Sequence, residues 1–350
     1  KSMGWKKLFF EGKVPDWFSF EIVSTGGDMH FYIRTLEDNR NLVETQIFSQ
    51  YPDAEIKIVD DYVTELPANL PSDEYDLFGT ELIFTKENAY PIKTHPFFEE
   101  ESGKDEFKRT DPLAPLAEAM TALGPGEHLW LQLVARPTGD EWTKTAKAVV
   151  DTIVGKKPKP PEPDVFSKTV GGLFQQLPLG GSATPKKEEK KNNDEFNTQK
   201  LTPGQKFLLD QVEAKIAKLA FKAGYRFLYI ARKDAFIKGR VSAVIGMFKQ
   251  VYSYNMNTFK PNGDTVTKAD GWFKWLFPSD RGFFADQQEY MRKYRVFRKY
   301  KQRGFVKKPV ILNTEELATL FHLPGINVKA PFFPRVQAKK GQPPAGLPTL

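Results

Sequence analysis

The fold of this chain is decided by residues 18–33, which read FSFEIVSTGGDMHFYI. Apolar and polar side chains alternate over residues 18–22 and again over 29–33, with the period of two that is typical of half-buried strands. Between the two runs, Gly26 and Gly27 can adopt the positive φ angles that a tight hairpin turn requires. The sequence therefore predicts an antiparallel β-hairpin near the start of the chain.

The residues after this hairpin predict a mixture of helices and strands. A helix with Val43, Ile47 and Tyr51 on one face comes first, and Asp111 with Pro112 begins a second helix. Strands are predicted at residues 54–58, 81–84, 90–92 and 128–134. This order fits a split βαβ sheet with both helices on one face, so we expect an α+β, ferredoxin-like module over residues 1–155.

A second module of the same kind is predicted over residues 201–330. It begins with a helix that Thr202 caps and that Gly224 ends, and Asn313 and Glu316 form a capping box before another short helix. Strands are predicted at residues 225–230 and 310–312, and further helices at 240–252 and 286–303. The fold class expected for the chain is thus α+β, with two ferredoxin-like (split βαβ) modules.

Two stretches have a composition that cannot form a packed core. Residues 156–200 combine Pro-rich, Gly-rich and mixed-charge runs, which predict a disordered linker between the modules. Residues 331–350 contain Pro343, Pro344 and Pro348 and predict a tail. Because the chain begins at Lys1 and carries no signal-peptide pattern, we expect it to be part of a longer protein.

The composition excludes several kinds of chemistry. The 350 residues include no Cys, which rules out disulfides, iron–sulfur sites and a thiol nucleophile. The four His residues share no metal-ligand spacing, and no apolar run approaches the length of a membrane span. Phosphate-binding, dinucleotide-binding, nucleophile-elbow and zinc-protease motifs are missing from the sequence. We therefore expect no cofactor, no metal and no catalytic residue in this chain.

Charge is distributed very unevenly along the sequence. Residues 1–150 carry 15 basic and 27 acidic side chains, a net charge of −12, whereas residues 201–350 carry 27 basic and 10 acidic side chains, a net charge of +17. Such asymmetry indicates an anionic partner for the basic half. The alternative is that the two halves attract each other, or attract neighbouring copies in an assembly.

The predicted helix at 286–303 is the most strongly basic segment. Tyr290, Tyr294 and Phe297 form an apolar stripe along it, which we expect to face the core. The candidate anion-binding residues are Arg292, Lys293, Arg295, Arg298, Lys299, Lys301 and Arg303. They could bind the phosphates of a nucleic acid or an anionic membrane surface, or they could form a solvated or protein-facing surface.

Three segments together resemble a known family. Residues 111–137 resemble the end, and residues 20–56 the start, of the accessory domain that precedes type IV secretion-like ATPases of candidate phyla bacteria. The most specific match, LNTEELATLFHLP at residues 312–324, is similar to the segment before the motor domain of conjugative coupling ATPases and related DNA-pumping motors. Residues 343–348 are also similar to the segment that leads into that motor domain.

This resemblance implies membrane segments before the chain and a nucleotide-hydrolysing motor after it, at the cytoplasmic face of the bacterial membrane. The implied partners are the chain's own motor domain and neighbouring subunits in a homo-oligomer, with a hexamer as one form. No family catalytic residue has a counterpart here. What carries over is a docking element made of Asn313, Glu316, Leu317, Leu320, His322 and Pro324. The rival interpretation is a free-standing nucleic-acid-binding protein that uses the basic half.

Overall fold

The computed structural model describes residues 17–101, 111–155, 201–248, 255–267 and 283–323. They belong to two units, one built around a β-sheet and a smaller helical unit within Asp140–Ala217. The predicted linker at 156–200 and the tail at 331–350 lie outside the described residues.

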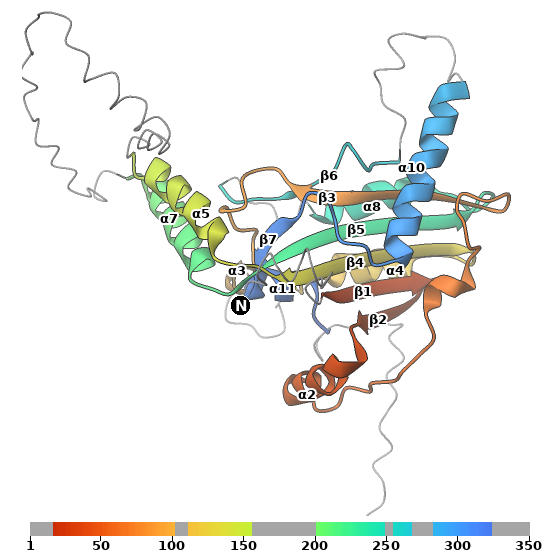
Figure 1. Ribbon diagram of the computed structural model, residues 1–350, viewed down its shortest axis with the longest axis horizontal. Coiled ribbons are helices and arrows are strands. Elements are labelled where there is room, and N and C mark those ends of the chain that lie inside the picture. The colour runs from red at the N-terminus through yellow and green to blue at the C-terminus, as the bar shows by residue number, and fades with distance from the viewer. Residues whose placement is uncertain (1–16, 102–110, 156–200, 249–254, 268–282, 324–350) are drawn as a thin grey trace, which may run out of the picture. The chain divides into compact units, whose positions relative to one another are not determined.

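The sheet unit contains one antiparallel seven-stranded sheet with the strand order β2-β1-β4-β5-β3-β6, and β7 pairs with β5 (Figure 1). Mixed helix and strand content around this sheet gives the α+β class that the sequence predicts. The strands are β1 (Phe18–Thr25), β2 (Asp28–Arg34), β3 (Tyr75–Phe84), β4 (Glu127–Pro137), β5 (Ala220–Arg232), β6 (Phe259–Pro261) and β7 (Val310–Asn313).

The predicted hairpin is confirmed by β1 and β2. These strands pair from Ser19↔Arg34 to Thr25↔Asp28, and the turn residues Gly26 and Gly27 have φ angles of 60° and 94°. Both angles lie in the left-handed region, which glycine adopts without steric cost. A side chain at Gly27 would also place its Cβ 2.9 Å from the carbonyl oxygen of Thr121. Both the backbone angle and the lack of space therefore require glycine at this position.

Strands from both halves of the chain form this sheet, which corrects the expectation of two separate modules. β4, from the first half, pairs with β5, from the second half, along the whole register from Glu127↔Ala231 to Pro137↔Phe221. β3 pairs with β5 on the opposite edge, from Tyr75↔Arg232 to Leu82↔Tyr225. Because β5 is buried over residues 223–231, its backbone N–H and C=O groups cannot bond to water, and strands on both of its edges pair with them.

Helices cover both faces of the sheet, not one. On one face, a core that includes Leu116, Met120, Val244 and Leu320 is contributed by the helices α4 (Ala114–Thr121), α8 (Lys238–Phe248) and α11 (Thr314–Leu320), together with α3 (His95–Glu101). The other face is covered by the short helix η2 (Tyr62–Glu65) and by α10 (Phe283–Lys301), which crosses the strands in Figure 1.

Several predicted elements differ in the structure. The helix α2 (Arg40–Gln50), which η1 (Glu37–Asn39) precedes, is present, but none of its residues is fully buried; Val43 and Ile47 are half-buried and Tyr51 is exposed. Residues 54–58 and 90–92 form no strand. The helix predicted at 240–252 is observed as α8 over Lys238–Phe248, and residues 249–252 lie outside the described part of the chain.

The helical unit contains α5 (Glu141–Ile153) and α7 (Pro203–Ile216), which bury Ala146 and Val149 on α5 and Leu209 and Val212 on α7. The predicted cap is confirmed, because the Thr202 hydroxyl accepts a hydrogen bond from the Gln205 amide at 3.3 Å. The prediction that Gly224 ends α7 is wrong, since this glycine lies inside β5.

Candidate functional site

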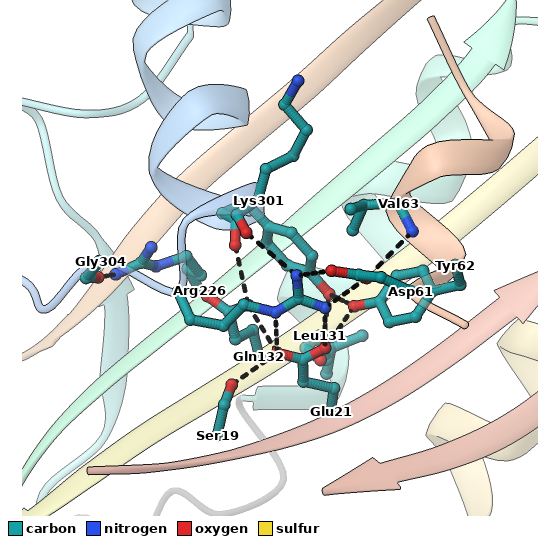
Figure 2. A network of polar contacts seen from close by, with 12 residues as sticks. Ser19, Glu21, Asp61, Tyr62, Val63, Leu131, Gln132, Arg226, Lys301 and Gly304 are labelled. Atoms are coloured by element: carbon teal, nitrogen blue, oxygen red, sulfur yellow. Dashed lines mark hydrogen bonds and ion pairs between the residues drawn. The ribbon is translucent and has the colours of Figure 1, made fainter. Parts of the chain in front are cut away.

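The most distinctive chemical feature of the molecule is a row of polar side chains that crosses five strands of the sheet. Register pairing places each residue directly opposite the next: Tyr32 on β2, Glu21 on β1, Gln132 on β4, Arg226 on β5 and Glu81 on β3. The last four are at most 3% exposed. Figure 2 shows Glu21, Gln132 and Arg226 side by side on neighbouring strands. We call this set the polar row.

Arg303 closes over the polar row from the end of α10. Its guanidinium donates to both oxygens of Glu21, at 3.0 and 3.1 Å, and to both oxygens of Asp61. Burial opposes the charged form of Asp61, but the hydrogen bond from Arg303 and its positive charge prevail and lower the pKa of that carboxyl. The same bonds raise the pKa of Arg303 above its usual value despite the burial of that side chain. The guanidinium is therefore a permanent cation shared by two acids.

The backbone at Arg303 explains how the side chain reaches this place. Its φ angle of 49° is left-handed, and it is the one non-glycine residue with a positive φ in the described part of the chain. The amide of Gly304 donates to the Lys299 carbonyl, and the amide of Arg303 donates to the Tyr300 carbonyl. This is the Schellman pattern that ends a helix, with arginine at the position usually taken by glycine.

Two tyrosines complete the network. The Tyr62 hydroxyl donates to Glu21 at 2.6 Å, and it lies 2.9 Å from the Tyr300 hydroxyl. Burial is the main cause that raises the pKa of both phenols well above the ordinary value, and the nearby Glu21 adds to it. Both tyrosines are therefore neutral hydrogen-bonding groups at any physiological pH.

The charges of this network balance. Glu21, Asp61 and Glu81 are acidic, whereas the basic members are Arg226, Lys299 and Arg303; Lys299 contacts Glu81 at 3.0 Å. Two buried atoms within it, Gln132 Oε1 and Arg226 Nε, have no hydrogen-bond partner among the residues that the structure describes. They belong to residues that are opposite each other in the β4–β5 register.

The basic residues predicted as an anion-binding surface are mostly used inside the fold. Lys293 pairs with Asp76 at 2.7 Å, Lys299 with Glu81, and Arg303 with Glu21 and Asp61. Arg292 donates to the Val266 carbonyl, and Lys301 donates to the Ala68 carbonyl. All four acids belong to the acidic first half, so these pairs support the alternative in which the two halves attract each other.

Only two of the seven basic residues are exposed, Arg295 and Arg298. Neither side chain has a partner among the residues that the structure describes. The expected apolar stripe is shifted: Phe297 is buried as predicted, but Tyr290 is 43% exposed, and Val296 and Tyr300 take the inward positions.

The predicted docking element is packed within the sheet unit. Asn313 and Glu316 form the predicted capping box, and Glu316 also accepts the Ile92 amide at 2.9 Å. Leu320 lies in the core and Leu317 packs against it. Pro324 lies outside the described residues.

His322 follows α11 and has two acceptors around its ring. Nδ1 lies 2.8 Å from the Ala318 carbonyl, and Nε2 lies 3.0 Å from Asp111. Burial opposes the charged form of Asp111, but the hydrogen bond from His322 lowers the pKa of that carboxyl. The ring therefore links the end of α11 to Asp111, which lies three residues before the start of α4.

Sequence reasoning missed the polar row. One member, Glu21, was visible in the polar half of the alternation in residues 18–22, which the period assigns to the opposite face from Phe20 and Ile22. That pattern does not show whether the opposite face meets solvent or another element.

Within the described residues, no group of His, Asp and Glu side chains could hold a metal ion, and none of the helices is both long and apolar enough to cross a bilayer. Neither the curated proteins nor the solved structures contain a match to this sequence. A family model matches residues 6–332, and the chain therefore belongs to the family described as a domain of unknown function (DUF8128).

Proposed function

We propose that this chain is a non-catalytic accessory and assembly region of a membrane-associated secretion or DNA-translocation ATPase. In this role it acts at the cytoplasmic face of the bacterial membrane, where it positions its own motor domain and neighbouring subunits. The proposal rests on the resemblance of residues 20–56, 111–137 and 312–324 to such accessory regions. It rests equally on where the charged side chains lie.

The observation that carries the proposal is the burial of the charged network beneath α10. A general acid or base must come within hydrogen-bond distance of a substrate. Glu21 and Tyr300 are 0% exposed, and the hydrogen-bond partners that the structure gives their side chains are other buried groups of this chain. Groups arranged in this way fix the position of α10 on the sheet. That arrangement supports a scaffold more than it supports an active site.

Calorimetry with Mg·ATP tests the non-catalytic part of the proposal. The chain contains no phosphate-binding loop, so we expect no saturable heat of binding. Stoichiometric, Mg-dependent binding of ATP would overturn the proposal. For the assembly part, the chain should co-elute with the separately expressed motor domain of the same gene product, and adding it should change the rate of ATP hydrolysis by that motor.

Nucleic-acid binding is the second candidate function, and the exposed pair Arg295 and Arg298 is the observation that favours it. If phosphates bind there, changing both residues to Glu should abolish binding to duplex DNA, and the affinity of the parent chain should fall steeply with salt. The matched control changes two exposed lysines on α5, Lys144 and Lys147, to Glu. If the assembly proposal is correct, DNA binding is weak at physiological salt and neither pair of changes affects it. Anionic vesicles in place of DNA test a membrane surface in the same way.

A further inference from the structure

β2 forms one edge of the sheet, and its outer side has no strand partner among the described residues. The two-residue turn at Gly26 and Gly27 sets which backbone groups face outward. Such a turn closes on a hydrogen-bonded pair, here Thr25 and Asp28, and hydrogen-bonded pairs then alternate along the ladder. The amide of Gly26 confirms this alternation, because it points away from β2 and donates to the carbonyl of Glu127 on β4. The outward groups of β2 are therefore those of Met29, Phe31 and Ile33.

The sequence of β2, DMHFYIR, is complementary to itself when it is reversed about Phe31. Asp28 then lies opposite Arg34, an acid opposite a base. Met29 lies opposite Ile33, both apolar, and His30 lies opposite Tyr32, both aromatic. Opposite charges and aromatic side chains that face each other across two antiparallel strands stabilise the pair.

This register also matches the hydrogen-bonding groups. Phe31 would face Phe31 of the other copy, and Met29 would face Ile33, so residues with outward amide and carbonyl groups meet each other throughout. The two faces of the sheet match as well. His30 and Tyr32 lie on the face of η2, where the Tyr32 ring stacks on Tyr62 at 4.9 Å. Phe31 lies on the opposite face, where its ring is 5.8 Å from that of Phe321.

The segment directly after β2 offers apolar surface for the same contact. None of residues 36–60 is buried. Most of the large exposed hydrophobic side chains of the described chain are in this segment: Leu36, Leu42, Phe48, Tyr51, Ile58 and Val59, which are 37–74% exposed. Large apolar patches on a protein surface often contact another protein, and these exposed side chains are available for such a contact.

We infer that two copies of this chain associate through their β2 edges, antiparallel and centred on Phe31, to form one continuous sheet. In that register Leu36 of each copy follows the end of β2 toward the partner's hairpin turn, so the exposed segment 36–60 adds apolar contacts at both ends. The inference names a second copy as one partner in the assembly role, and in that respect it rests on the proposed function. The contact is two-fold and closes at a dimer, so a larger ring would need another surface.

A charge swap tests the inference with the whole chain. Sedimentation equilibrium over a concentration series should show a monomer–dimer equilibrium for the parent. Asp28→Arg places two arginines opposite each other, and Arg34→Asp places two acids opposite each other, so each single change should weaken dimerisation by about tenfold or more. The double change restores opposite charges and should restore the dimer. Circular dichroism establishes that each variant is folded.

Amide hydrogen exchange locates the contact independently of any substitution. In the dimer, the amides of Met29, Phe31 and Ile33 should become protected as the protein concentration rises. The amides of His30 and Tyr32, which bond to β1, serve as internal controls and should stay protected at every concentration. A parent chain that stays monomeric throughout the series overturns the inference, as does a dimer whose outward amides exchange freely or a double variant that does not recover. These outcomes do not depend on ATP or on the motor, so they are distinct from a failure of the proposed function.

Discussion

Arg303 shows how a single residue can link a helix to a sheet. Its left-handed backbone costs about 1 kcal/mol for a residue other than glycine. In return, the side chain leaves the helix end at the angle that brings its guanidinium onto Glu21 and Asp61. The next residue, Gly304, could take the left-handed position without that cost, but the helix would then end one residue later and the arginine would no longer sit over the polar row.

At the residue scale, the lowered pKa of Asp61 predicts that the stability of the fold depends on pH. Its folded pKa is lowered, so the stability that it contributes is present above its ordinary pKa of about 4 and is lost as the pH falls through the lowered value. Asp61→Asn should therefore be less stable than the parent at pH 7, with a difference that closes as the pH falls toward about 2. Urea unfolding at a series of pH values measures this; a difference that grows on acidification would contradict the assignment.

At the scale of elements, local chemistry predicted most of the helices and strands. The hairpin turn, the caps at Thr202 and Asn313 and the strand at 128–134 each depend on residues close together in sequence, and all are observed. Residues 54–58 alternate as a strand does but form none, because a strand must also pair with another strand, and alternation alone does not decide that pairing. The stripe at Val43, Ile47 and Tyr51 lies on a helix as predicted, but periodicity does not show how deeply a face is buried, and none of the three side chains is fully buried.

Two glycines make a matched pair of predictions at this scale. A Cβ at Gly224 would lie 2.4 Å from Val306 Cγ1, so this glycine lets the segment after α10 approach β5. Gly224→Ala should destabilise the protein by about 1–3 kcal/mol, and adding Val306→Ala should recover part of the loss. Gly246, on the exposed side of α8, has nothing within 4 Å of a new Cβ, and Gly246→Ala should stabilise by about 0.5–1 kcal/mol. Urea unfolding measures the change in stability at both positions. Equal changes would contradict the idea that Gly224 is needed for the close approach of Val306.

At the scale of the whole molecule, the pairing of distant strands could not be predicted from the sequence. β4 and β5 read locally as buried strands, and nothing in either shows that they pair with each other. The charge asymmetry was visible, but its meaning depended on which acids the basic segment would meet. Lys293, Lys299 and Arg303 were singled out as candidates for binding an external anion, whereas the structure pairs them with acids of the same chain. Their partners Asp76, Glu81, Glu21 and Asp61 lie more than 200 residues away in the sequence, so no local pattern relates them.

The central claim is that the basic charge at the end of α10 holds the molecule together, and not that it binds an external anion. The most direct test compares the free energy of unfolding of Arg303→Gln with that of Arg298→Gln, which removes the same charge from an exposed position on α10. We predict a loss of about 3–5 kcal/mol for Arg303→Gln, because two acids lose their shared cation, and a change within about 0.5 kcal/mol for Arg298→Gln. If both variants were as stable as the parent, the claim would be contradicted.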